Sequence, residues 1–164
     1  YASTGPGGTP NISMISLERG AGIEMNHIPF RGSGEVMQAM VGGQLHLFTD
    51  QGNLVRQYNL HPIAVFSAER AREFPDTPTM RELGYDLVFT IWSGLYAPAA
   101  TPEPVLQRLE AACLRMMQAQ PVLDGLRRMD MPVRVRNRAE FTAFHRAEYE
   151  RFGTLVRQYN LRVN

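Results

Sequence analysis

The sequence predicts an α/β protein with a largely parallel sheet, and three observations support this. Short apolar runs alternate with helical patterns along residues 1–95, which is typical of parallel strands joined by helices. From residue 100 the pattern becomes mostly helical. The charge changes there too: residues 1–99 hold 6 Arg and 9 acidic residues, whereas residues 100–164 hold 11 Arg and 7 acidic residues. We therefore expect two parts, residues 1–95 and residues 96–164.

In the first part, strands alternate with short helices. Strands are expected at residues 1–3, 24–29, 45–49, 62–67 and 87–95. Helices are expected at residues 12–19, 33–41, 52–59, 68–74 and 79–83. Gly20 and Gly22 are expected to end the first, and Gly42-Gly43 the second. The run 62–67 is almost continuously apolar, which predicts a strand buried on both faces.

The second part is predicted to hold three helices and one strand. Thr101 is expected to cap a helix whose first residue is Pro102, and Pro121 is expected to begin another. A short strand is expected at 131–135. Asn137 and Glu140 have the spacing of a capping box and precede a long helix.

That last helix carries an apolar stripe at helical spacing. Its members are Phe141, Phe144, Phe152, Leu155, Val156 and Tyr159. A segment with so few strands cannot cover such a stripe itself, and exposed apolar surface favours association. We therefore expect this chain to self-associate or to exchange elements with another copy.

One heptapeptide, Leu-Val-Arg-Gln-Tyr-Asn-Leu, occurs at 54–60 and again at 155–161. The sequences around the two copies do not match, so the chain is not a repeat protein. Both copies have the pattern of an amphipathic helix end.

Composition excludes several kinds of chemistry. All 17 basic residues are Arg, which rules out a Schiff-base or phosphate-binding lysine, and Arg does not act as a base near neutral pH. The net charge of +1 argues against a nucleic-acid partner. The single cysteine, Cys113, and four scattered histidines lack metal-ligand spacing, so neither a metal nor a cofactor is expected.

The chain does not begin with Met, and its first residues do not have the pattern expected of a signal peptide. It opens directly on what resembles a strand end. We therefore expect it to begin inside a longer protein. It has no apolar stretch of about 18 residues, the length needed to span a membrane.

The first candidate site is a glycine-rich turn between a strand and a helix. Its residues are Ser3, Thr4, Gly5, Gly7, Gly8 and Thr9. Glycines let the backbone approach a ligand closely, and a helix N-terminus with free N–H groups favours an anion. The pattern matches no dinucleotide or P-loop motif, so an ordinary turn is the alternative.

A second strand-to-helix turn contains Arg31, Gly32 and Ser33. Arg31 is able to hold a carboxylate through two hydrogen bonds; the alternative is a solvated side chain. Asp50 follows the next strand, either as a ligand acceptor or as the cap of the following helix.

Together these turns resemble the motifs of one receptor family, in the same order along the whole chain. They are Tyr1-Ala2-Ser3-Thr4-Gly5-Pro6-Gly7, His27-Ile28-Pro29-Phe30-Arg31-Gly32-Ser33, Gly42-Gly43-Gln44-Leu45, Pro75-Asp76-Thr77-Pro78-Thr79 and Trp92-Ser93-Gly94-Leu95-Tyr96-Ala97-Pro98. The family comprises the Bug-type (TctC-like) periplasmic solute receptors of tripartite tricarboxylate transporters.

The resemblance implies a two-domain, periplasmic-binding-protein fold of type II, a Venus flytrap, of which this chain is about half. It implies a periplasmic receptor, not an enzyme, that binds a small carboxylate or amino-acid-like solute and passes it to membrane permease subunits. Residues 1–95 then correspond to the second domain without its opening helix, and residues 96–164 to the segment completing the first.

The chain departs from the family pattern at Ala2, Asn11, Phe30 and His46, where Gly, His, Tyr and Asp are usual. These departures bear on which ligand binds more than on the fold. An α/β-cleft enzyme of the acyl or phosphoryl transferase type is the alternative from another class, although the missing lysine and nucleophile triad weigh against it. A solute sensor with the same fold is a third hypothesis.

Overall fold

The computed structural model describes residues 1–129 and 131–160, and it divides into two compact units. The first comprises Tyr1–Ile91 and the C-terminal segment from Leu155, and the second comprises Trp92–Thr154. We describe each unit by itself. Within the described residues, no helix combines the length and apolarity that a membrane span requires.

The sheet of the first unit is parallel, as predicted, but smaller than expected. Strand β1 (Ala2–Ser3) pairs in parallel with β2 (Ile28–Pro29), and Ala2 also forms a parallel bridge with Phe48. The predicted strand at 45–49 is therefore reduced to one bridge, with a hydrogen bond from the Ala2 N–H to the Leu47 carbonyl of 2.9 Å. Strand β1 therefore lies between β2 and the segment that contains Phe48.

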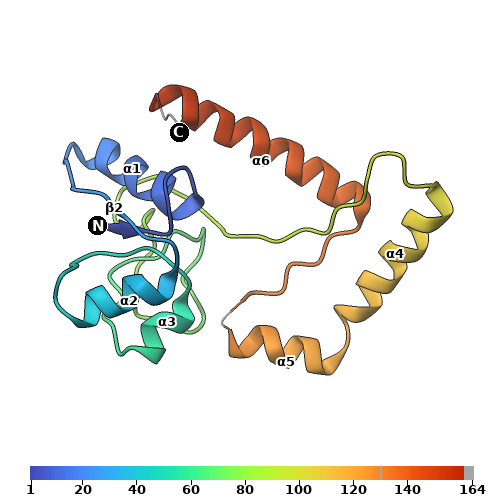
Figure 1. Cartoon of the computed structure of the whole chain (residues 1–164), viewed down its shortest axis with the longest axis horizontal. Helices are drawn as coiled ribbons and strands as arrows, with labels where there is room; N and C mark the ends of the chain where they lie inside the picture. The colour runs from blue at the N-terminus through green and yellow to red at the C-terminus, as the bar shows by residue number, and fades with distance from the viewer. Residues whose placement is uncertain (130, 161–164) are drawn as a thin grey trace. The chain divides into compact units, whose positions relative to one another are not determined.

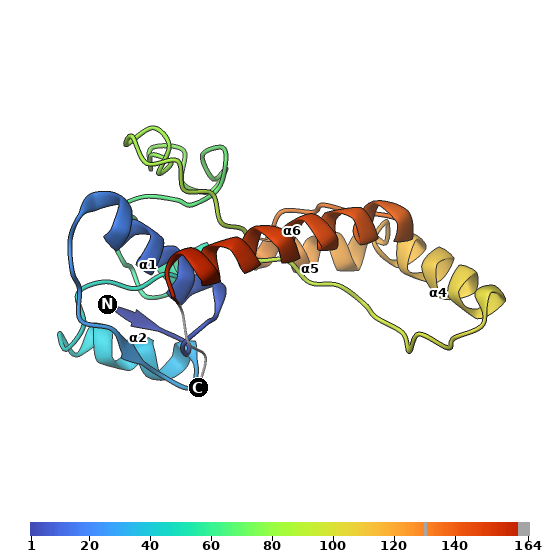
Figure 2. The ribbon, with the colours of Figure 1, turned by 90° about the horizontal axis from the view of Figure 1, so that it is seen from above.

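Two helices cover β1. Figures 1 and 2 show α1 (Thr9–Ala21) and α2 (Ser33–Val41) on opposite sides of it. The core between β1 and α2 consists of fully or almost fully buried apolar side chains: Ala2, Val36, Met37, Ala39 and Leu45. Burial of this apolar surface is the main force that holds the two layers together.

Helix α1 begins three residues earlier than its sequence pattern predicted. Gly8 is the N-cap and Pro10 lies in the first turn, where its fixed φ suits a helix and its missing N–H costs nothing. Gly22, with φ of 65°, ends the helix in the left-handed conformation. The predicted helix at 52–59 is α3 (Gly52–Gln57).

The predicted strands at 62–67 and 87–95 are wrong. Val65 forms one isolated parallel bridge with Thr79, and the Phe89 N–H donates to the Phe66 carbonyl over 2.8 Å. No ladder continues from these bonds within the described residues, partly because Pro62 and Pro78 have no N–H to donate. Ile63 is 63% exposed, so burial on both faces is also wrong.

The predicted helices at 68–74 and 79–83 are turns. Thr79 and Glu82 do form a reciprocal capping box: the Thr79 N–H donates to Glu82 Oε2 at 2.7 Å, and the Glu82 N–H donates to Thr79 Oγ1 at 3.1 Å. The chain leaves the helical path after one turn, at Gly84 with φ of 91°. The capping box is therefore present at residues 79–82, but no helix continues beyond that one turn.

The second unit contains α4 (Glu103–Met116), α5 (Gln120–Arg128) and most of α6 (Arg138–Gln158). Helix α4 is capped by Pro102 rather than Thr101, a one-residue correction. The capping box of α6 is confirmed, with 2.9 Å hydrogen bonds between Asn137 and Glu140 in both directions. The predicted strand at 131–135 is wrong, because these residues have no regular secondary structure.

An aromatic cluster joins the extended segment 92–96 to α6 within this unit. Trp92 meets the rings of Phe141 and Phe144 edge to face, with centroids 5.8 and 5.4 Å apart, a favoured aromatic geometry. Gly94 lies against Phe141 so closely that a Cβ there would be 2.2 Å from Phe141 Cζ. Glycine is therefore required for the close approach.

The repeated heptapeptide has a structural explanation. The first copy ends α3 and the second ends α6, apart from Leu161, which lies outside the described residues. Asn59 and Asn160 occupy the same position in the two copies, and both are left-handed, with φ of 50° and 49°. After glycine, Asn is the residue most often found in this helix-ending conformation. The prediction that both copies are helix ends is confirmed.

Candidate ligand site

The candidate turns meet at one edge of the parallel sheet. Residues following β1, β2 and the Phe48 bridge lie at carboxyl ends of segments that run in the same direction, where ligands bind in open α/β sheets. The first two turns are joined by the Phe30 N–H, which donates to the Ser3 carbonyl over 2.9 Å. The second and third are joined by a hydrogen bond from Ser33 Oγ to Asp50 Oδ2.

The turn after β1, which we call the glycine loop (residues 4–8), leads into α1. Gly5 and Gly7 have φ of 117° and 77°, which side-chain-bearing residues rarely adopt. The first turn of α1 contains no acidic residue and no side-chain cap. Its first N–H groups have no intrahelical acceptor, so this helix start offers donors and a favourable dipole to an anion.

One predicted donor of the glycine loop is already engaged. The Gly7 N–H donates to Asn11 Oδ1 over 3.0 Å, so Gly7 contributes loop shape rather than a free donor. Asn11 is only 4% exposed, and its amide group also donates to Tyr1 Oη over 3.1 Å.

Ser3 is fully buried below the loop and bonds to two groups. Its hydroxyl donates to the Gly5 carbonyl over 3.0 Å and lies 2.8 Å from His27 Nε2. The His27 ring also stacks on Tyr1, with centroids 4.9 Å apart. The Ser–His contact therefore supports the loop, because the serine is not accessible to a substrate.

Burial shifts both rings of this stack. Burial, followed by the charge of Glu18, raises the pKa of Tyr1 to about 12. Burial, followed by the positive N-terminus, lowers the pKa of His27. Burial therefore disfavours the charged form of both rings.

The second turn has a different electrostatic character. The Arg31 N–H donates to Glu35 Oε2 at 3.2 Å, and Glu35 lies in the first turn of α2. Asp50 accepts from Ser33 and from the Gln51 N–H at 2.8 Å. Gln51, not Asp50, is the N-cap of α3. Two carboxylates, against the one cation Arg31, thus lie near this helix start, and the excess of negative charge disfavours an anion there and favours a hydroxyl or ammonium group.

Sequence reasoning identified the three turns but missed the residues that support them. Tyr1, Asn11, His27 and Glu35 were not among the predicted site residues. The signal for His27 was its place in the motif before Arg31, and the signal for Asn11 was its place just after the glycine loop, in the first turn of α1. Neither position reveals a hydrogen bond across 24 residues of sequence, such as that between His27 and Ser3.

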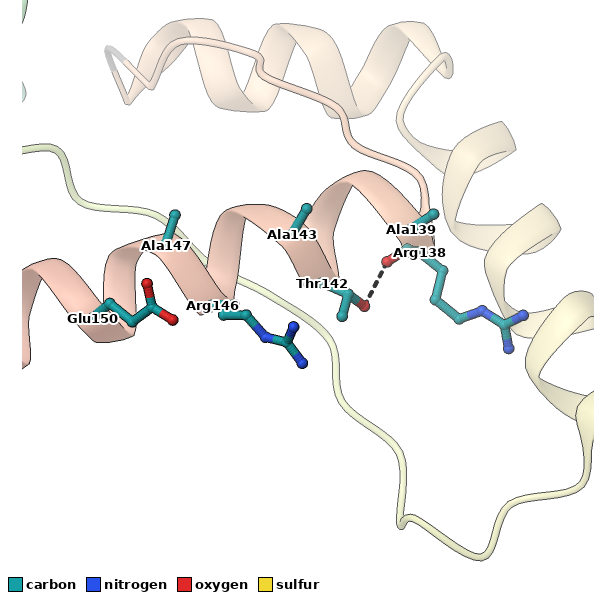
Figure 3. A pocket seen from close by; sticks show the side chains of 7 residues that line it. All are labelled: Arg138, Ala139, Thr142, Ala143, Arg146, Ala147 and Glu150. Atoms are coloured by element: carbon teal, nitrogen blue, oxygen red, sulfur yellow. Dashed lines mark hydrogen bonds between the residues drawn. The ribbon is translucent and has the colours of Figure 1, made fainter.

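A hollow of about 630 Å³ lies elsewhere, along α6. Figure 3 shows that all its lining side chains project from successive turns of this one helix, including Ala139, Ala143 and Ala147. Because its lining comes from one helix alone, it is an open hollow rather than an enclosed site. The glycine loop, by contrast, leads into a helix start whose first N–H groups have no intrahelical acceptor.

Comparisons with known proteins support the predicted fold. A MatC structure from Rhodopseudomonas palustris with bound malate is similar at 29% identity and a TM-score of 0.82, over 94% of this chain and 55% of that chain. A ligand-free TctC solute-binding protein from Polaromonas is similar at 26% identity and a TM-score of 0.73, over 96% of this chain and 56% of that chain. The fold is thus that of a solute-binding receptor, as predicted.

The model of the tripartite tricarboxylate transporter receptor family, TctC, matches residues 1–161. The chain belongs to this family. A UPF0065 protein encoded in the gbd 5′ region of Cupriavidus necator is 31% identical over 88% of this chain and 45% of its own length. The chain therefore spans about half the length of the curated relatives it matches.

Proposed function

We propose that the full-length protein is a periplasmic receptor that captures a small carboxylate for a tripartite transporter and does not transform it. The observation that supports this most directly is the glycine loop and the uncapped, acid-free start of α1 at the carboxyl edge of a parallel sheet. A carboxylate gains from the helix dipole and from N–H donors at such a position. Membrane permease subunits of the transporter are the proposed partners.

The proposed site comprises all three turns, which have distinct roles. Ser3, Thr4, Gly5, Gly7, Gly8 and Thr9 shape the carboxylate end. We propose that Arg31, Gly32 and Ser33 of the second turn, with Asp50 of the third, contact the rest of the ligand. Because Asp50 and Glu35 add negative charge there, a ligand with a hydroxyl or ammonium group beside its carboxylate fits better than a plain dicarboxylate.

Calorimetric titration of the full-length protein tests this proposal. Malate is the first titrant, because the similar MatC structure contains it, and aspartate and succinate test the second turn. We expect Gly8→Val to weaken binding at least tenfold. Gly8 has an ordinary φ of −74°, and an added Cβ would be 3.7 Å from Pro10 Cδ, so this variant adds bulk without straining the backbone.

Gly7→Val is expected to abolish binding too, but its φ of 77° means that valine would also deform the loop. Arg81→Ala is the control, because Arg81 pairs with Asp86 on an exposed surface, and we expect unchanged affinity. Equal affinity in Gly8→Val and the parent protein would move the site away from the glycine loop. Turnover of the ligand that is lost in Ser33→Ala or Ser93→Ala would favour the enzyme alternative.

A further inference from the structure

Two backbone atoms of the glycine loop form hydrogen bonds with side chains that lie outside it. The Gly7 N–H donates to Asn11 Oδ1 at 3.0 Å, and the Gly5 carbonyl accepts from Ser3 Oγ at 3.0 Å. Both glycines are left-handed or nearly so, with positive φ. A loop with three glycines among five residues has many accessible backbone conformations. The hydrogen bonds at these two atoms therefore restrict it strongly.

Tyr1 links the two hydrogen bonds, because it contacts both Asn11 and His27. Its hydroxyl oxygen accepts from Asn11 Nδ2 at 3.1 Å, and its ring stacks on His27. The single proton of the Ser3 hydroxyl is donated to the Gly5 carbonyl, so the 2.8 Å contact requires His27 Nε2 to be the donor. An unbroken series of contacts thus runs from the Gly5 carbonyl through Tyr1 to the Gly7 N–H.

We propose that Tyr1, Asn11 and His27 are positioning residues that hold the glycine loop in its ligand-binding conformation before the ligand arrives. Asn11 and Ser3 are almost or fully buried, and hydrogen bonds shielded from water hold their geometry more firmly. A loop ordered in advance loses less conformational freedom on binding, which raises affinity. The ligand part of this inference rests on the proposed function, whereas the order of the free loop does not.

Amide hydrogen exchange, followed by NMR on the ligand-free, full-length protein, tests the ordering directly. Asn11→Leu removes the acceptor of the Gly7 N–H, and we expect exchange at Gly7 to become at least tenfold faster. Asn11→Asp is the matched variant. It keeps an acceptor oxygen for Gly7, and its second oxygen accepts from the Tyr1 hydroxyl, so exchange at Gly7 is expected to stay within about twofold of the parent rate.

Two further pairs test the connection through Tyr1 and His27. Tyr1→Phe removes only the hydroxyl and keeps the ring, so we expect faster exchange at Gly7, whereas Tyr85→Phe, a half-buried tyrosine outside the loop, leaves it unchanged. His27→Gln retains an N–H donor near the Nε2 position, so it is expected to preserve loop order better than His27→Ala. Tyr1→Phe also decides the matter should Asn11→Leu fail to fold.

Malate titration of the same variants completes the test. We expect Asn11→Leu to weaken binding at least fivefold, with amide exchange in α2 unchanged. Unchanged exchange at Gly7 in folded Asn11→Leu, or equal acceleration in the loop and in α2, would overturn the positioning role. If the parent protein binds no carboxylate or amino acid but Gly7 exchange responds as expected, the proposed function fails and the positioning role stands.

Discussion

The two units of this chain differ in what holds them together. In Tyr1–Ile91, apolar side chains of β1 and α2 are fully buried against each other, as for Met37 and Val36. In Trp92–Thr154, none of the described residues of α4, α5 or α6 is buried. The comparison teaches that the first unit carries its own core, whereas the second is held by a half-exposed aromatic cluster and surface ion pairs.

The largest expected effect tests the core of the first unit. Met37→Ala removes a side chain with no exposed surface, so we expect a loss of about 2–5 kcal/mol in the free energy of unfolding. Leu109→Ala on α4 removes a side chain that is 50% exposed, so in the 164-residue chain we expect a change within about 0.5 kcal/mol. Urea denaturation followed by circular dichroism measures both.

The same two substitutions, made in the full-length protein, sharpen the comparison between the two units. If the remaining half of the receptor covers the apolar face of α4, Leu109→Ala becomes a core substitution there and costs about 2 kcal/mol or more. A small effect in both lengths of chain would mean that this face stays exposed. Self-association of the 164-residue chain stays a prediction, and sedimentation at several concentrations tests it.

The elements that the sequence predicted well are those whose signals are local. The α2 bounds follow from Ser33 and the glycines at 42 and 43, and the α6 start follows from Asn137 and Glu140. The strands at 62–67, 87–95 and 131–135 were predicted from apolar pattern alone, and a strand needs a partner that supplies ladder bonds. Within residues 1–129 and 131–160, no partner forms a continuous ladder with any of these three segments, so none of them is a strand of a sheet.

The next effect tests the second unit through its aromatic cluster. Gly94→Ala would place a Cβ 2.2 Å from Phe141 Cζ, so the ring must move, at a cost of about 1–3 kcal/mol. Trp92 is the only tryptophan, so its fluorescence reports this unit alone. We expect a changed emission spectrum and a lower midpoint of unfolding by this probe.

Gly34→Ala is the control for that substitution. Gly34 lies in α2, and an added Cβ would meet nothing within 4 Å, so alanine is expected to stabilise the helix by up to about 1 kcal/mol. A Trp92 spectrum that is the same in Gly94→Ala as in the parent chain would contradict the close packing of segment 92–96 on α6.

A smaller effect concerns the ends of α3 and α6. Asn59 and Asn160 are left-handed, and a β-branched residue there costs about 1–2 kcal/mol. We therefore expect Asn59→Val and Asn160→Val to destabilise the chain by about 1 kcal/mol each, and Asn59→Gly to be neutral or slightly stabilising. Thermal unfolding measures all three. Equal stability of Asn59→Val and Asn59→Gly would show that the heptapeptide is not a helix-ending signal.

The ligand site could be predicted only in outline, for a comparable reason. Glycine content and the strand–helix order predicted where the turns lie, because both are local properties. The availability of each donor depends on side-chain contacts as well: the Gly7 N–H is engaged by Asn11, four residues further on, and the start of α2 is near Asp50, 17 residues beyond Ser33. Which N–H groups remain for a ligand is therefore a property of the folded site.

The smallest expected effect is a difference in how the pKa of one carboxylate from each unit responds to salt. A hydrogen bond from the Thr79 N–H, helped by Arg70, lowers the pKa of Glu82 in the first unit. Its partners include a backbone amide that carries no net charge. In the second unit, a hydrogen bond from Arg138, at 2.6 Å, lowers the pKa of Glu103. The comparison therefore sets a mainly amide-bonded carboxylate against a mainly ion-paired one.

A carboxyl group whose pKa is lower in the folded than in the unfolded state stabilises the fold above its unfolded pKa, and this contribution is lost as the pH falls through the lowered value. Both groups thus lose their contributions below the ordinary value of 4.5. Salt at about 1 M screens exposed charge pairs, so the pKa of Glu103 is expected to rise toward 4.5 more than that of Glu82. Carboxyl carbon NMR titration at low and high salt measures both, and Arg138→Gln should reproduce the salt effect at Glu103 while leaving Glu82 unchanged. An equal salt response at the two sites would mean that ion pairing, not the Thr79 amide, dominates in the first unit as well.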